Sequence, residues 1–71
     1  MNNTDNREFF TIVYNIDDVE TVEEYEEFDD ARSDFKYFTE MHDVEYAVLQ
    51  HVCIEDGIET IDIVFEYRKG E

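Results

Sequence analysis

His51, Cys53 and Asp62 are the residues whose types and spacing come nearest to a catalytic group. His51 and Cys53 lie two apart in one predicted strand, and Asp62 lies opposite His51 in the next. A cysteine nucleophile needs a base within hydrogen-bond reach and donors that stabilise an oxyanion. A small open sheet offers no cleft, and a chain with two glycines has no glycine-rich loop to supply the donors. We therefore expect a cross-strand ion pair of His51 and Asp62 beside a half-buried thiol, and no enzyme.

Carboxylates also bind metals, and this chain has 21 of them. A calcium loop needs alternating Asp or Asn ligands around a glycine and a glutamate at its twelfth position. Residues 17–27 contain no glycine and lack that pattern. Cys53, His51 and His42 do not make the four ligands of a zinc site, and no glycine-rich phosphate-binding motif is present. We expect no dedicated metal site and no cofactor.

Composition excludes several classes of protein. The 71 residues include 21 acids and five bases, which gives a formal net charge of −16. A protein that binds nucleic acid directly needs a positive surface, and a single cysteine cannot build a disulfide scaffold. No apolar run approaches the roughly 18 residues of a membrane-spanning helix. Residues 1–7 are polar and lack the apolar core of a secretory signal, so we expect a cytoplasmic protein.

The hydrophobic pattern predicts a hairpin at the start of the chain. Residues 9–16 alternate as a strand, and the side chains on its core face are expected to be Phe10, Ile12, Tyr14 and Ile16. Asp17 and Asp18 then signal a turn. Residues 19–28 fit either a helix or a second strand. We prefer the strand, because ten acids within residues 17–34 would repel one another along one continuous helix.

A helix is expected after this segment. Asp29 and Asp30 provide an N-cap and an acidic first turn, which complement the helix dipole. Ala31, Phe35 and Phe38 follow at helical spacing and form an apolar stripe that can pack on a sheet. The helix is expected to end near residues 42–43, His42 and Asp43.

The last third of the chain predicts a second hairpin, with strands over residues 44–54 and 58–67. They flank Asp56 and Gly57, a residue pair favoured in a type I′ turn. A two-residue loop fixes the register. The pairs expected on one, almost wholly apolar face are Ile54–Glu59, Val52–Ile61, Gln50–Ile63, Val48–Phe65 and Tyr46–Tyr67. The pairs expected on the other face are Cys53–Thr60, His51–Asp62, Leu49–Val64 and Ala47–Glu66.

These elements predict a small α+β fold, in which one helix packs on one face of an antiparallel sheet of three to four strands, in the order β(β)αββ. Residues 1–7 are expected to form a flexible tail and residues 8–69 a single domain. The face away from the helix is expected to carry Leu49, Cys53 and Val64. This face is more apolar than solvation requires, which makes it a candidate homodimer or partner face.

Residues 17–34, with the sequence DDVETVEEYEEFDDARSD, are the strongest anomaly. Neighbouring carboxylates on a strand or a helix face are about 5–7 Å apart. Successive phosphates along one DNA strand lie at a similar separation, given about 3.4 Å of axial rise per step plus the helical path. Interleaved tyrosines can act as anchors for a partner. The candidate partner-binding residues are Asp17, Asp18, Glu20, Glu23, Glu24, Tyr25, Glu26, Glu27, Asp29, Asp30, Asp34 and Tyr37.

In size, charge and this acidic run, the sequence resembles small acidic phage proteins that mimic DNA. These include anti-restriction proteins, inhibitors of uracil-DNA glycosylase and some anti-CRISPR proteins. The resemblance extends over the whole chain and rests on no diagnostic motif. It implies an inhibitor that uses neither catalysis nor a cofactor. Such a protein-protein interaction would occlude the nucleic-acid groove of a basic protein in the host cytoplasm.

Two other interpretations remain open. Halophilic adaptation also produces acidic proteins that are poor in lysine, and Lys36 and Lys69 are the two lysines here. That interpretation predicts acids spread evenly over the surface. A small dimeric adaptor would instead use the apolar sheet face, with the charge serving solubility.

Overall fold

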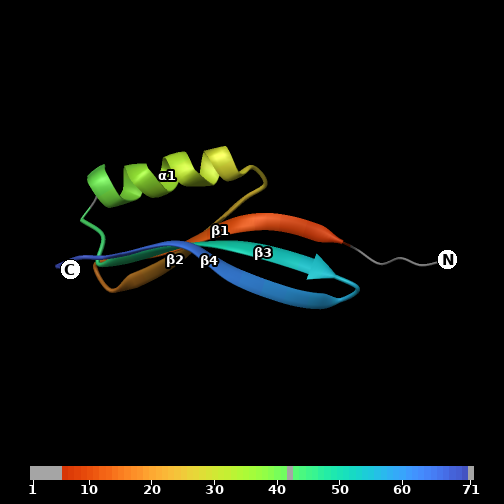
Figure 1. Cartoon of the computed structure of the whole chain (residues 1–71). Coiled ribbons are helices and arrows are strands. Elements are labelled where there is room, and N and C mark those ends of the chain that lie inside the picture. The colour runs from red at the N-terminus through yellow and green to blue at the C-terminus, as the bar shows by residue number, and fades with distance from the viewer. Residues whose placement is uncertain (1–5, 42, 71) are drawn as a thin grey trace.

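The computed structural model describes residues 6–41 and 43–70 as a four-stranded antiparallel sheet with one helix on one face (Figure 1). In chain order the elements are β1 (Arg7–Ile16), β2 (Val19–Tyr25), α1 (Phe28–Met41), β3 (Tyr46–Glu55) and β4 (Ile58–Arg68). The strand order is β2-β1-β3-β4, so β2 and β4 are the edge strands. This confirms the predicted α+β fold. In the part of the chain described, no helix is long and apolar enough to cross a membrane.

Both hairpins turn on residues with positive φ. Asp17 and Asp18 have φ of 53° and 65°, and Asp56 and Gly57 have φ of 53° and 79°. A type I′ turn requires positive φ at both central residues, and its twist matches that of the flanking strands. Aspartate tolerates this region better than most residues, because its short side chain can bond locally. The preference for a strand over residues 19–28 is confirmed for Val19–Tyr25.

The first and last residues of the strands and the helix differ slightly from the predicted ones. Strand β1 begins at Arg7, so the predicted flexible tail is wrong at this residue, because Arg7 is paired with Ile54 in the sheet. Residues 1–5 lie outside the described residues. Helix α1 starts one residue before the predicted acidic turn, at Phe28, and ends at Met41. His42, where the helix was expected to end, also lies outside the described residues.

A β-bulge changes the register of the second hairpin. The predicted pairs hold from the turn to Gln50–Ile63, and the register then shifts between Leu49 and Gln50. Leu49 consequently pairs with Phe65, which leaves Val64 as the extra residue. The predicted pairs Leu49–Val64, Val48–Phe65, Ala47–Glu66 and Tyr46–Tyr67 are therefore wrong.

The bulge places Phe65 on the helix side of the sheet. A one-residue shift in register turns every later side chain to the opposite face. The ring of Phe65 thereby comes within 6.4 Å of the Phe28 ring and 5.7 Å of the Phe35 ring, centroid to centroid. The Phe65 side chain is 41% exposed, so these contacts bury part of its ring against α1, and this partial burial favours the observed register.

The core lies between α1 and the two central strands. Ile12, Ala31 and Leu49 are each fully buried there, which confirms the predicted core face of β1 and the apolar stripe of the helix. Leu49 is thus beneath the helix, and Cys53 shares its side of the sheet because strand residues alternate. The predicted dimer face of Leu49, Cys53 and Val64 is therefore wrong for the first two residues. Val64 is exposed at the bulge.

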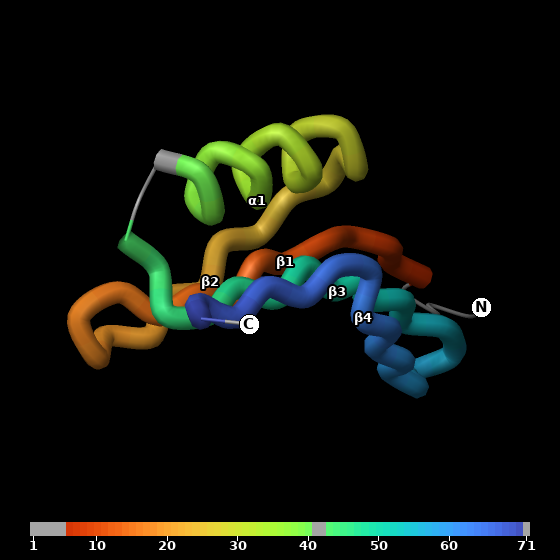
Figure 2. The backbone as a smooth tube through the Cα atoms, turned by 60° about the vertical axis from the view of Figure 1, so that its left-hand side comes forward, coloured from red at the N-terminus to blue at the C-terminus, as the bar shows by residue number. Residues whose placement is uncertain are grey.

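The opposite side of the sheet, which we call the open face, points away from α1 (Figure 2). Its central strands carry Phe9, Val13, Val48 and Val52. Phe9 and Val52 are buried even here, and the guanidinium of Arg7 lies 4.6 Å from the centroid of the Phe9 ring. The almost wholly apolar face predicted for the second hairpin corresponds to this open face as far as Gln50 and Ile63, whereas its predicted members Phe65 and Tyr67 lie on the helix side.

Candidate acidic binding surface

Nine acidic residues follow the edge strand β2 and the segments at its two ends. Asp17 and Asp18 form the turn before β2, and Asp29 and Asp30 lie in the first turn of α1. All nine are exposed, and we call them the acidic belt: Asp17, Asp18, Glu20, Glu23, Glu24, Glu26, Glu27, Asp29 and Asp30. Because β2 is an edge strand, no further strand of the sheet covers this side.

The belt has carboxylates on both sides of the sheet edge. Glu23 pairs with the buried Ile12 and therefore lies on the helix side, whereas Glu24 pairs with Thr11 and lies on the open side. Glu20 and Glu24 share the open side but are four residues apart, about 14 Å along a strand. The carboxylates of β2 therefore alternate between the two sides of the sheet edge. On the open side Val22 lies between Glu20 and Glu24, so the closely spaced row of carboxylates expected on one strand face is interrupted.

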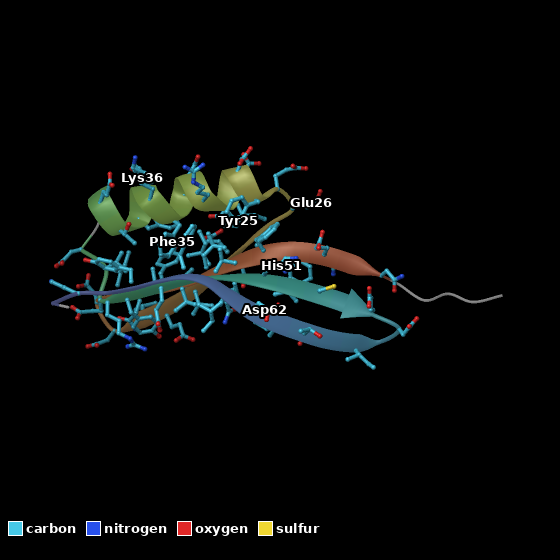
Figure 3. All side chains as sticks on the ribbon, in the orientation of Figure 1. Tyr25, Glu26, Phe35, Lys36, His51 and Asp62 are labelled. Carbon is cyan, nitrogen blue, oxygen red and sulfur yellow. The ribbon has the colours of Figure 1, made fainter. Side chains whose placement is uncertain are left out.

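Few cations compensate the belt. In residues 6–41 and 43–70 its one ion pair joins Arg7 Nη2 to Glu24 Oε1 at 3.6 Å, and both side chains are more than half exposed. Lys36 lies on the helix and points away from the sheet (Figure 3). Uncompensated carboxylates that gather along one edge create a negative potential, which attracts a cationic partner over a distance.

Tyr25 and Asp34 hold the helix against the sheet. The hydroxyl of Tyr25 donates a hydrogen bond of 2.8 Å to Asp34 Oδ2, and both residues are half-buried. Burial, followed by the contact with Asp34, raises the pKa of Tyr25 above its ordinary value. Figure 3 shows Tyr25 between the helix and the sheet, beside Phe35. These two predicted partner-binding residues thus have a structural role.

Tyr37, the other predicted anchor, lies on the exposed part of the helix. Its side chain is about half exposed, and its ring meets Phe38 edge-on at 6.1 Å. Tyr37 lies about two helical turns after Asp30, so its exposed ring is beyond the end of the acidic belt.

Two further tyrosines, which the sequence did not single out, restrain belt glutamates. Tyr14 donates a 3.5 Å hydrogen bond to Glu23 Oε2, and Tyr46 donates to Glu20 Oε1. Burial and then the Glu23 charge raise the pKa of Tyr14, and the bond to Glu20 raises the pKa of Tyr46. The first contact joins the neighbouring strands β1 and β2, and the second joins β3 to β2 across β1. Only knowledge of the strand order could therefore have revealed them.

The residues first considered for catalysis form a different pairing from the expected one. His51 is opposite Asp62 in the register, as predicted, but its Nε2 lies 2.9 Å from Glu8 Oε2 on the other neighbouring strand. The His51 ring also packs on Phe10 at 5.0 Å. Figure 3 shows His51 and Asp62 on the sheet, near the end at which α1 begins. Among the described residues, no group of three or more His, Cys, Asp or Glu could hold a metal ion.

No family model matches this chain, and neither the curated proteins nor the solved structures include a match. Its function is therefore inferred from its own surface and charge.

Proposed function

We propose that this protein is an acidic DNA mimic that inhibits a basic nucleic-acid-binding protein by occupying its nucleic-acid groove. The observation that supports this proposal is the acidic belt, whose nine exposed carboxylates share one ion pair in the described part of the chain. Neither a catalytic group nor a cofactor is needed for such an inhibitor. The proposed site of action is the cytoplasm of a host cell, with the gene carried by a phage.

The charge density of the belt suits this role. The seven residues of β2 extend about 24 Å, and the turn and connector at its ends bring the belt to about 30 Å. One strand of DNA carries a phosphate every 3.4 Å or so, which amounts to about nine charges over the same length. The belt therefore presents about the charge of one DNA strand to a groove lined with Lys and Arg.

Restraint of the carboxylates favours tight binding. Strand β2 is paired with β1 along its whole length, and tyrosine hydroxyls hold Glu20 and Glu23. A charge that is already positioned loses less conformational entropy on binding than one on a free side chain. The belt is thus better suited to mimicry than an acidic tail of equal charge.

Capture of the target from a bacterial lysate tests the proposal. The tagged protein is expected to capture a basic DNA- or RNA-handling protein, and duplex DNA is expected to displace it. The quadruple variant E23K/E24K/E26K/E27K should lose this capture. A matched control, E40K/E55K/E59K/D62K, changes the net charge equally at exposed acids outside the belt and should keep it.

Two results would contradict mimicry. One is a captured protein that duplex DNA leaves bound. The other is an equal loss of capture in both quadruple variants, because net charge alone would then explain binding.

A further inference from the structure

The open face of the sheet is an apolar surface of unusual extent for so acidic a chain. Val22 on β2, Val13 on β1 and Val48 on β3 form a row across three strands. Ile61 and Ile63 continue the apolar surface on β4, where they alternate with residues of the helix side. Val22, Ile61 and Ile63 are 58%, 49% and 61% exposed. No helix or loop within residues 6–41 and 43–70 covers this face (Figures 1 and 2).

Three carboxylates at the border of the open face, Glu20, Glu24 and Glu66, have partners, in contrast to most of the belt. Arg7 pairs with Glu24 at 3.6 Å, and Arg68 pairs with Glu66 at 3.5 Å. Glu20 accepts a hydrogen bond from a tyrosine hydroxyl. Two of the chain's three arginines are thus placed around this one face. Local neutralisation lowers the repulsion that a second negative molecule would meet here.

The border charges are also self-complementary. Arg68 lies at one corner of the open face, Glu20 lies at the opposite edge of the same row, and Glu59 lies at the other end of β4. Two copies that meet face to face are related by a two-fold axis in the plane between their sheets. An axis along the strands brings Arg68 of one copy over Glu20 of the other, and an axis across the strands brings it over Glu59. Either arrangement therefore places opposite charges together.

The area is adequate for a weak but specific dimer. The strand pairing gives the face three rows on β2 and five rows on each of the other strands, with strands about 4.8 Å and rows about 6.8 Å apart, or about 600 Å² for each copy. The pair would bury about 1,200 Å², which is the lower end of the range for a specific interface. Two sheets packed in this way lie about 10 Å apart, as in a β-sandwich.

We propose that the open face binds the open face of a second copy, which gives a face-to-face homodimer with a dissociation constant in the micromolar range. Glu20 and Glu24 border the open face, whereas the other seven residues of the acidic belt lie outside it and remain accessible in this dimer. The inference does not depend on the inhibitor function, because its apolar contacts involve no residue of the acidic belt.

The response to salt distinguishes the proposed dimer from the proposed inhibitory complex. Two copies of net charge −16 repel each other, so added salt should strengthen the dimer. Salt should weaken the binding of a basic target, because it screens attraction there. The two associations are therefore expected to respond to NaCl with opposite signs.

Sedimentation equilibrium of the full chain tests the dimer, with two matched double variants. V22Q/I63Q changes one valine on β2 and one isoleucine on β4 on the open face. V19Q/I58Q changes the same residue types on the same strands but on the helix side, at positions that are 62% and 68% exposed. The native chain should approach twice its 8.6 kDa mass at high concentration. We expect V22Q/I63Q to weaken dimerisation about tenfold or more, and V19Q/I58Q to leave it within about twofold.

A charge variant provides a second readout that does not depend on the apolar changes. R68E should weaken the dimer, whereas R32E, at an exposed position on α1, should affect it much less. A native chain that stays monomeric at several hundred micromolar in about 0.5 M NaCl would overturn the proposal. An equal effect of the two double variants, with both shown to be folded by circular dichroism, would overturn it as well.

Discussion

Replacement of Tyr25 by phenylalanine isolates the hydrogen bond that joins β2 to α1. The variant keeps the ring between helix and sheet but removes the hydroxyl that donates to Asp34 at 2.8 Å. A hydrogen bond to a charged group contributes about 1.5–3 kcal/mol when it is well buried. Because both partners are half-buried, we expect the free energy of unfolding at pH 7 to fall by about 1 kcal/mol.

The same variant changes how the free energy of unfolding depends on pH in the alkaline range. The pKa of Tyr25 is raised in the folded protein by burial and by Asp34, so the folded state holds the phenolic proton more tightly than the unfolded state. This contribution to stability is fully present below the unfolded pKa of about 10 and is lost as the pH rises above it. Between pH 9 and pH 11 the native protein should lose about 1 kcal/mol more than Y25F.

Urea denaturation followed by circular dichroism at pH 7, 9, 10 and 11 measures both effects. Y46F is a useful comparison, because Tyr46 also donates to a glutamate but at an exposed site, and a smaller effect is expected there. The reasoning would be refuted if Y25F matched the native protein at pH 7 and the two curves stayed parallel to pH 11.

Three further predictions concern the charge, the core and the bulge. The melting temperature should rise when NaCl is increased from about 0.02 to 0.5 M, because salt screens repulsion within a chain of net charge −16; a flat melting temperature would show that repulsion is negligible. L49A should cost about 3 kcal/mol in urea denaturation, because Leu49 is fully buried beneath α1; a loss below about 1 kcal/mol would mean that the helix does not cover it. Deletion of Val64 should preserve the fold, because the extra residue is lost while Leu49–Phe65 and Gln50–Ile63 stay paired; an unfolded deletion variant would contradict this register.

Elements with strong local signals could be predicted from the sequence. Asp56 and Gly57 determine the turn of the second hairpin and hence its pairs as far as Gln50–Ile63. The acidic first turn and the spacing of Ala31 and Phe35 indicate the helix. In each case the determining residues are neighbours in the sequence, so local propensity and tertiary structure agree.

The bulge could not be predicted, because Val64 and Phe65 are both apolar and the alternation of residue types gives no sign of a shift. The predicted choice of the sheet face that the helix covers was wrong because it assumed a hairpin without this bulge. Without the bulge, the sequence places the larger apolar set of β3 and β4 on what is in fact the open face. The observed register packs Phe65 against two helix phenylalanines, and this is a long-range contact.

The candidate site was predicted in part. The structure places nine of the predicted acidic residues on exposed positions along β2 and the segments at its two ends, where a run of acids in the sequence already indicated them. Tyr25 and Asp34 were expected at a partner interface, yet they bond to each other. Their contact follows from how α1 lies over β2, which no local pattern records.

The salt dependence of target binding is the most direct test of the inhibitor proposal. The affinity of the captured protein would be measured by calorimetry from about 0.1 to 0.4 M NaCl, with the native chain and with E23K/E24K/E26K/E27K. Mimicry of a DNA strand predicts that the native affinity falls at least about tenfold over this range, and that the variant binds weakly throughout. An affinity that is indifferent to salt, or equal for the native chain and the variant, would contradict it.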